Sequence, residues 1–449
     1  MKKIVILVLG LIVCQYSFGQ SLFESAASIE SKTDLSDVNY DLNGYVRGVA
    51  YVGENPVDGK TALKSGYGEA ALKLKASKSD FGSFFTELRF RDGYEYGDEL
   101  EEFEVTEAYV TAYAGPLDIR LGKQIVAWGK ADGVNPTDNI TPINGVVRSP
   151  ESDDLRIGNF LTKINWNLSS IFQLEGIYIP KYRNSVMTFD LLEWPEGSQV
   201  GEDFYPNQNL KNASYALKLK YAGAKVDGSI SYFAGYNTLP GLIVSSFQMN
   251  PDYSTEVEIS PKAFRNQIIG ADFSTSLGNW GVRGEGAYRI VPDRYDDDYY
   301  APESELFFVL GFDRSWGDFS LIAQYMGRYV PDFEKVSNAS PEEVGAEKYT
   351  ELQLARVNQL YFQQNDVWNH SMSLRPAMNF LYDNLTIEAF GMYHFTTEEF
   401  LLRPQVTYSM SDGIKLSAGA EYYHGGEDTL NDLISPIFNG AFVELRMSF

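Results

Sequence analysis

Apolar and polar residues alternate over short segments along most of the chain. Between residues 72 and 75, for example, Leu72 and Leu74 alternate with Lys73 and Lys75. A period of two residues indicates a β-strand with two different faces. The alternating segments are about 9 to 12 residues long, which is the length that a tilted strand needs to cross a lipid bilayer.

The alternation predicts eighteen strands. Their approximate positions are 42–53, 66–76, 83–92, 103–114, 117–128, 160–168, 171–179, 213–222, 225–236, 267–277, 280–290, 305–316, 319–329, 368–380, 385–395, 400–410, 414–424 and 439–449. The expected fold is an all-β, transmembrane antiparallel β-barrel of about 18 strands, with a range of about 16 to 18.

The connections between these strands alternate between short and long. The short ones contain the Gly, Asn, Asp, Ser and Pro residues of tight turns, at 77–82, 115–116, 169–170, 223–224, 278–279, 317–318, 382–384 and 411–413. The others are mostly long, near 129–159, 180–212, 237–266 and 330–367, with 396–399 as an exception. Such sorting of loop lengths is typical of a barrel with short periplasmic turns and long extracellular loops.

The last segment of the chain is an alternating strand that ends on an aromatic residue. Its apolar positions run from Ala441 to Phe449, and the other face carries Glu444, Arg446 and Ser448, with Phe442 out of pattern. We expect this strand to pair with the first one and close the barrel. A terminal Phe resembles the C-terminal signal of Gram-negative outer-membrane barrels, which implies that Phe449 is an insertion signal read by the barrel-assembly machinery.

The first residues have the pattern of a secretory signal peptide. Lys2 and Lys3 precede an apolar run at 4–13, and Ser17 and Gly19 are the small residues of a cleavage site. We expect residues 1–19 to be the signal peptide, 20–40 a short periplasmic segment and 41–449 the outer-membrane barrel.

The only cysteine lies within this predicted signal. Cys14 follows Val13, a position that takes a small residue in lipoprotein signals, so lipidation is the less favoured alternative to a discarded apolar cysteine. A mature chain that begins near residue 20 then has no thiol for disulfides or metal binding.

Composition favours one large barrel over the two or three soluble domains that 449 residues also allow. The 30 Tyr and 28 Phe suit the aromatic belts at membrane interfaces. The net charge of −24 lies mostly in predicted loops and excludes nucleic acid as an expected partner.

Positions that face the predicted lumen carry both signs of charge. Basic residues gather on the second, third and fifth strands, which predicts an anionic cargo site with the candidates Lys73, Lys75, Arg89, Arg91, Glu107, Arg120 and Gln124. The alternative is a wall of solvated charges in which these cations pair with Glu87, Glu107 and Asp118. The mixed signs indicate weak selectivity or ion pairs, since a strongly selective pore carries a ring of one sign.

The most distinctive local sequence begins on the fifth strand. It reads Arg120-x-Gly122-x-Gln124, then Trp128-Gly129, then a Pro-rich and Asp-rich stretch from Asn135 to Pro142. This pattern resembles a family of poorly characterised porin-like outer-membrane barrels of Gram-negative bacteria, similar in outline to alginate-export and phosphate-selective porins.

The stretch after the fifth strand is too rich in turn residues for a helix. One interpretation is a constriction loop that folds into the pore, with Trp128, Asn135 and Asp138 as candidate residues. The alternatives are an external cap and a simple loop stabilised by its turns.

Chemistry other than transport finds little support. The three histidines, His370, His394 and His424, lie on different strands, and no catalytic or phosphate-binding motif is present. The acidic stretch 293–298 lacks the spacing of a calcium loop. We therefore expect no enzyme activity, no cofactor and no metal site.

The main hypothesis is a multi-pass outer-membrane transport protein, a porin-like channel for polar or anionic small molecules. The alternative, implied by the resemblance, is the outer-membrane component of a lipid or lipoprotein export system. Its partners would be an inner-membrane permease of the resistance-nodulation-division (RND) type and a periplasmic carrier. A third hypothesis is a plugged barrel whose loops bind other surface proteins. Outer-membrane lipid is a partner in each case.

Overall fold

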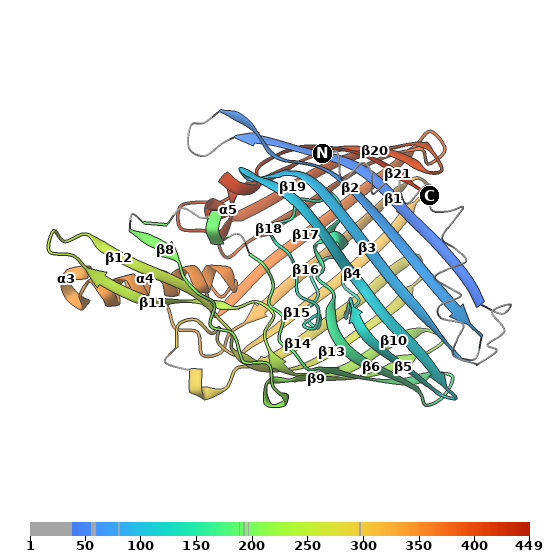
Figure 1. The fold of residues 1–449 in the computed structure, drawn as a ribbon, viewed down its shortest axis with the longest axis horizontal. Coiled ribbons are helices and arrows are strands. Elements are labelled where there is room, and N and C mark those ends of the chain that lie inside the picture. The colour runs from blue at the N-terminus through green and yellow to red at the C-terminus, as the bar shows by residue number, and fades with distance from the viewer. Residues whose placement is uncertain are drawn as a thin grey trace, which may run out of the picture. The chain divides into compact units, whose positions relative to one another are not determined.

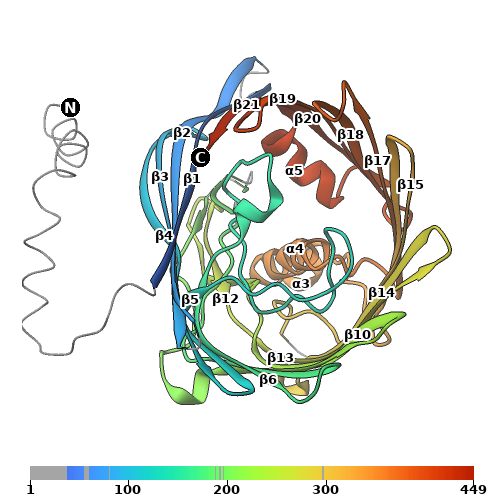
Figure 2. The same cartoon turned by 90° about the vertical axis from the view of Figure 1, so that its right-hand side faces the viewer.

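The structure, a computed structural model, describes residues 38–449 apart from 55–59, 80, 188, 192–193, 196 and 296–297. Its main feature is a closed antiparallel barrel made of one 18-stranded sheet. Figures 1 and 2 show the barrel from the side and along its axis. The predicted signal peptide and nearly all of the predicted 20–40 segment lie outside the described residues.

Every predicted strand corresponds to one strand of this barrel. The barrel strands are β1 (Val38–Glu54), β2 (Thr61–Lys78), β3 (Gly82–Glu95), β4 (Asp98–Ala114), β5 (Leu117–Gln124), β6 (Asn159–Asn167), β7 (Phe172–Ile179), β9 (Ser214–Ala222), β10 (Val226–Tyr236), β13 (Arg265–Leu277), β14 (Trp280–Ile290), β15 (Glu305–Trp316), β16 (Phe319–Tyr329), β17 (Trp368–Phe380), β18 (Leu385–His394), β19 (Glu399–Ser411), β20 (Ile414–His424) and β21 (Gly440–Ser448). The predicted strand number is confirmed.

The prediction for the fifth strand was too long at its C-terminal end. The alternating pattern continues to Trp128, whereas β5 ends at Gln124. The chain leaves the wall there because the next two backbone N–H groups bond to side chains: Ile125 to Glu107 at 2.8 Å and Val126 to Thr141 at 2.9 Å.

The barrel closes where the first and last strands pair. β1 and β21 run antiparallel from Tyr45 opposite Ser448 to Val52 opposite Ala441. Beyond this register, Phe449 and Gly44 exchange two backbone hydrogen bonds of 2.9 Å. The predicted pairing of the C-terminal strand is therefore confirmed.

The two faces of the wall differ as the alternation predicts. On β21, Val443, Leu445 and Met447 are 46–52% exposed on the outside, while Glu444 is 3% exposed on the inside. Phe442, which broke the pattern, also points inward and packs on Tyr51 with ring centroids 5.3 Å apart. The outer surface is therefore apolar and suited to lipid.

The short connections gather at the end of the barrel that holds the C terminus, here called the turn end, and the long ones at the opposite loop end (Figure 1). Several two-residue turns begin with a glycine in the left-handed region, such as Gly115 at φ 60° and Gly278 at φ 64°. Other residues rarely adopt this backbone conformation.

The long connections at the loop end contain elements that the sequence analysis did not predict. A small sheet orders β11 (Gly241–Met249), β12 (Thr255–Lys262) and β8 (Ser198–Val200), and α4 (Ala346–Tyr361) follows the short α3 (Pro341–Val344). The remaining elements are α5 (Leu430–Phe438) and the 3₁₀ helices η3 (Ser152–Leu155), η4 (Phe189–Leu191), η5 (Leu210–Asn212) and η6 (Asp293–Tyr295).

One side chain makes two hydrogen bonds between the helix α4 and the small sheet, and Leu354 packs against the same sheet. Asn358 accepts a hydrogen bond from the backbone N–H of Leu242 at 2.9 Å and donates one to its carbonyl at 2.8 Å. Figure 1 shows α3 and α4 beyond the loop end of the barrel, and along the barrel axis α4 lies within the outline of the opening (Figure 2). Among the described residues, no helix is long and apolar enough to span a bilayer.

Candidate functional site

The connection between β5 and β6, residues 125–158, turns into the barrel, and we call it the inward segment (Figure 2). Its base is closed by Thr141, whose hydroxyl accepts a hydrogen bond from the N–H of Val126 and donates one to the Val126 carbonyl at 2.8 Å. Its other contacts go to lumen-facing side chains on several parts of the wall and to other loops, such as the bond from the Gly145 N–H to the Val186 carbonyl at 2.7 Å.

The first of these contacts is made by Glu285 on β14, which is 4% exposed. Its carboxylate accepts hydrogen bonds from the backbone N–H groups of Lys130 at 2.8 Å, Ala131 at 3.2 Å and Thr137 at 2.8 Å, and from the Thr137 hydroxyl at 2.7 Å. Gly129 permits this arrangement, because its φ is 105° and an added Cβ would lie 2.5 Å from a Glu285 oxygen.

A second contact is made by Trp128, which is 4% exposed. Its indole N–H donates to Glu175 on β7 at 2.7 Å, and Lys220 on β9 donates to the same carboxylate at 2.7 Å. The Lys218 ammonium lies 5.2 Å from the centroid of the indole ring. Trp128 is thus held between a buried acid and a cation on neighbouring strands.

The three candidate residues of the predicted constriction loop share one hydrogen-bonded turn. Asp138 accepts from the Trp128 N–H at 3.2 Å and donates its own N–H to the Asn135 carbonyl at 3.1 Å. Arg156 donates to the second Asp138 oxygen at 2.7 Å. Burial raises the pKa of Asp138 above its usual value, and Arg156 offsets only part of this effect.

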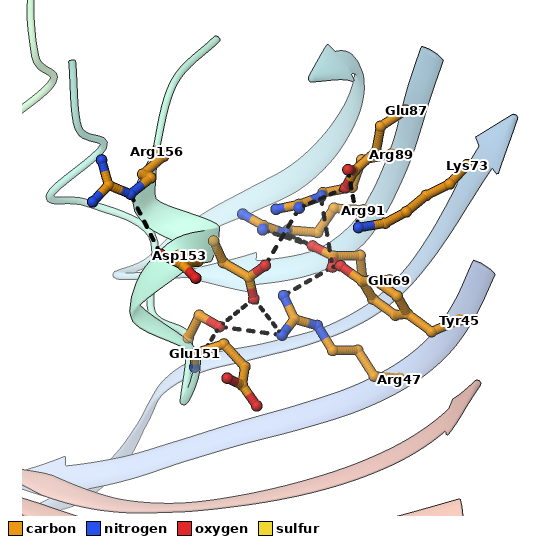
Figure 3. Close-up of polar contacts among 12 residues, drawn as sticks. Tyr45, Arg47, Glu69, Lys73, Glu87, Arg89, Arg91, Glu151, Asp153 and Arg156 are labelled. Atoms are coloured by element: carbon orange, nitrogen blue, oxygen red, sulfur yellow. Dashed lines mark hydrogen bonds and ion pairs between the residues drawn. The ribbon is translucent and has the colours of Figure 1, made fainter. Parts of the chain in front are cut away.

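A charged cluster around Arg47 joins the inward segment to β1, β2 and β3 (Figure 3), and Glu444 adds a contact to β21. The Arg47 side chain is completely buried, and it pairs with Glu69 at 2.8 Å, Asp154 at 2.7 Å and Glu444 at 3.1 Å. Ser149 donates to Asp154 at 2.6 Å. Asp154 comes from the inward segment, so one buried arginine links that segment to the strands that close the barrel.

Three cargo candidates belong to the same cluster. Arg91 pairs with Glu69 at 2.7 Å, Arg89 with Glu87 at 3.0 Å and Asp154 at 3.3 Å, and Lys73 with Glu87 at 3.1 Å. With Arg47 and Glu444, the cluster holds four basic and four acidic groups. Its charge is therefore compensated internally.

The other cargo candidates lie outside this cluster. Arg120 donates to the Thr111 hydroxyl at 3.3 Å and its guanidinium lies 4.4 Å from the centroid of the Tyr109 ring. Gln124 is completely buried and donates to the Leu161 carbonyl at 3.2 Å. Lys75 is exposed and has no ion-pair partner in the described part of the chain.

A third group of contacts ties the inward segment to the last loop. Arg148 pairs with Glu421 on β20 and donates to the carbonyl of Phe438, the last residue of α5, at 3.0 Å. Arg403 on β19 pairs with Glu421 at 3.2 Å and donates to the Pro150 carbonyl at 2.7 Å.

Two polar cavities flank the inward segment and extend to the turn end. One, of about 540 Å³, is lined by charged residues that include Lys130, Lys220 and Asp227. The other, of about 420 Å³, is lined by Lys415 and Arg446 among others. These cavities leave polar space for a small solute beside the inward segment.

Sequence reasoning missed Arg47, Arg148 and the role of Asp154. Arg47 has the same parity as the inward-facing Tyr45, so the alternation contained a signal for it. Arg148 and Asp154 lie in a loop, where no period shows which side chains turn to the wall. Within the described chain, no group of three or more His, Cys, Asp or Glu residues is placed to hold a metal ion.

Comparisons with known proteins agree with this architecture. The family model described as "Protein of unknown function (DUF1302)" matches residues 19–439. No curated protein matches the sequence.

Solved porin structures share the fold. The crystal structure of Acinetobacter baumannii OccAB1 has a TM-score of 0.53 and 11% identity, covering 94% of this chain and 98% of that one. The structure of Pseudomonas aeruginosa OccK5 (OpdH) has a TM-score of 0.53 and 10% identity, covering 92% of this chain and 97% of that one. The structure of a BenF-like porin from Pseudomonas fluorescens Pf-5 has a TM-score of 0.53 and 11% identity, covering 92% of this chain and 98% of that one. At such low identity, the likeness establishes the fold alone.

Proposed function

We propose that this chain, which belongs to the DUF1302 family, forms a porin-like channel that passes polar or anionic small molecules across the outer membrane. The observation that carries the proposal is a closed barrel with an apolar exterior, with an inward segment that is hydrogen-bonded to its polar inner wall. The names of the similar solved structures, which are porins, support the same function and an outer-membrane location.

The charges near the turn end support a weak preference for anions. Lys75, Arg120, Lys415 and Arg446 point into the lumen and have no ion-pair partner within the described chain. Glu107, Asp118, Glu151 and Asp227 are acids that also have no ion-pair partner within the described chain, so the free charges of the two signs are similar in number. The proposed preference therefore rests on local grouping, because Lys415 and Arg446 line one cavity together, and such a group attracts anions without excluding other solutes.

Single-channel recording on the purified protein in planar bilayers tests this function. Steady conductance, with a reversal potential in a KCl gradient that favours chloride, is the expected result. Replacing Lys75, Arg120, Lys415 and Arg446 with Gln should move the reversal potential toward potassium. Arg283→Gln is a control, because Arg283 already pairs with Asp313 at 2.6 Å. A barrel that never conducts would overturn the channel.

The similarity to alginate-export and phosphate-selective porins stays a prediction, as does the absence of enzyme activity. The export alternative, with an RND-type permease and a periplasmic carrier as partners, also stays a prediction. A non-conducting barrel that co-purifies with such partners would favour it.

A further inference from the structure

A separate cavity of about 120 Å³ lies at the loop end, where residues of β15 to β19, the inward segment, α4 and α5 line it. We call it the mouth cavity. Its apolar lining consists of Val134, Phe307, Met326, Leu360, Met392 and Leu430.

The apolar side chains from the barrel wall stand at positions where a channel lumen is usually polar. Phe307, Met326 and Met392 share the inward parity of their strands, and Met326 is 3% exposed. The next inward positions on β15 and β16 hold Glu305 and Arg328. These three side chains form the apolar part of the wall patch that faces the cavity, and the polar Ser371 of β17 lies between β16 and β18.

The rest of the apolar lining comes from three connections far apart in the sequence. Val134 belongs to the inward segment, Leu360 to α4 and Leu430 to α5. These three residues line the cavity together with the wall patch.

The polar groups around the cavity combine uncharged hydrogen-bonding side chains with the charged Arg328 and Glu399 and with His370 and His394. Arg328 lies 4.3 Å from the centroid of the Phe307 ring, but both Glu305 oxygens accept from it at 2.5 and 2.6 Å. Glu399 accepts a hydrogen bond from the Asn431 N–H at 2.5 Å. Gln363 supplies an uncharged amide.

We propose that the mouth cavity binds the apolar part, a single ring or a short alkyl chain, of a neutral amphipathic solute with hydroxyl or amide groups. An apolar cavity of about 150 Å³ in another protein is large enough for benzene, so a volume of this order suits one ring. This inference rests on the proposed channel function, because the bound solute would be one that the channel transports. Binding to the cavity can still be measured in a protein that does not conduct.

The test compares two neutral sugars that differ in their apolar part, phenyl β-D-glucoside and methyl β-D-glucoside. Binding to the full chain in lipid nanodiscs is measured by isothermal titration calorimetry. We expect the phenyl glucoside to bind at least about tenfold more tightly, because the methyl group leaves most of the apolar surface unfilled. Equal binding of both sugars, or binding of neither, would overturn the proposal.

Two single variants locate the site. Met392→Gln changes the wall and Leu430→Gln changes α5, so a folding defect in one leaves the other informative. Each should weaken phenyl glucoside binding about fivefold or more, because an amide replaces apolar contact area. Met187→Gln is the matched control, since Met187 lies beside Gly145 and outside the cavity lining. Unchanged binding in both cavity variants would reject this site.

Conductance is recorded separately on the same preparations. If the protein conducts but binds the two sugars equally, the proposed binding at the mouth cavity is wrong and the proposed channel function stands. A protein that binds the phenyl glucoside at this site but never conducts disproves the channel and supports the cavity.

Discussion

Thr137 donates two hydrogen bonds to Glu285, one from its backbone N–H at 2.8 Å and one from its hydroxyl at 2.7 Å. The two residues are 148 positions apart, one on the inward segment and the other on β14. A charged carboxylate accepts such bonds more strongly than a neutral amide does. Glu285 is therefore the main point at which the segment is held to this side of the lumen.

Glu285→Gln should loosen the inward segment. The carboxylate accepts four hydrogen bonds, and an amide NH₂ in place of one oxygen would face donors. We expect larger and noisier single-channel currents. Asp313→Asn serves as the control, because Asp313 also faces the lumen but pairs with Arg283 on the neighbouring strand. Currents of the same size and noise in the Glu285 variant would show that the segment is held elsewhere.

Arg47→Met should destabilise the whole barrel. In this variant Glu69 keeps Arg91 and Asp154 keeps Arg89, but Glu444 loses the one ion-pair partner it has among the described residues. Removing one partner of a buried pair costs about 3–5 kcal/mol, and the free energy of unfolding in urea measures it.

A control and a rescue separate this effect from a general loss of charge. Arg283→Met breaks a pair whose side chains are 31% and 32% exposed, so it should cost no more than about 1 kcal/mol. Adding Glu444→Gln to Arg47→Met should recover part of the loss. Equal stabilities for the Arg47 and Arg283 variants would contradict a structural role for the cluster.

Acid should release the part of the inward segment around Asp154. Burial disfavours its charge, but attraction to Arg47 and Arg89 and the hydrogen bond from Ser149 outweigh this effect and lower the pKa below 3.8. We call the inward segment docked when it makes the contacts described above. A lowered pKa of Asp154 means that ionised Asp154 stabilises the docked segment at pH values above the ordinary pKa. This stabilisation is lost as the pH falls through the lowered pKa.

Asp138 has the opposite effect on the pH dependence of stability. Its pKa is raised, so the docked segment binds a proton at Asp138 more readily than the released segment does. Between about pH 5 and about pH 3, hydrogen exchange corrected for intrinsic rates should rise at residues 149–156 and not at 135–141. Asp154→Asn should show the same pattern at neutral pH. Uniform exchange over both stretches would reject the assignment.

The strands were predictable because lipid and lumen impose different residues on the two faces of one wall. The end of β5 was not, since Val126 and Trp128 continue the alternation while the contacts of Ile125 with Glu107 turn the chain inward. The helix α4 was missed because its buried residues, such as Leu354, depend on β11, which is itself part of a long loop.

The sequence predicted which residues of the strands face the lumen, but not which partners they contact. Parity placed Glu285 and Arg89 in the lumen, but their partners lie on the inward segment, and no local pattern in the sequence determines a contact across such separations. The tight turns, in contrast, were predictable from local sequence. Gly115 adopts a positive φ that other residues rarely adopt, so a glycine there indicates a turn without any distant contact.

Phe449 allows a test that separates an insertion signal from a structural seam. Its backbone exchanges two hydrogen bonds with Gly44, whereas the residue as a whole is 61% exposed. Phe449→Ala keeps the backbone bonds and removes only the aromatic ring. If the ring is the signal, this variant should insert as poorly as the chain that lacks residue 449, when insertion is measured by heat-modifiable mobility of outer-membrane fractions.

The comparison variant is Phe160→Ala on β6, which removes a ring that is 50% exposed on the barrel exterior. It should insert normally, since one outward ring contributes little to a surface with many apolar residues. The Phe449→Ala molecules that do insert should conduct like the parent, because the ring lies outside the lumen. Normal insertion of Phe449→Ala with failure of the deletion would instead assign the role to the backbone bonds with Gly44.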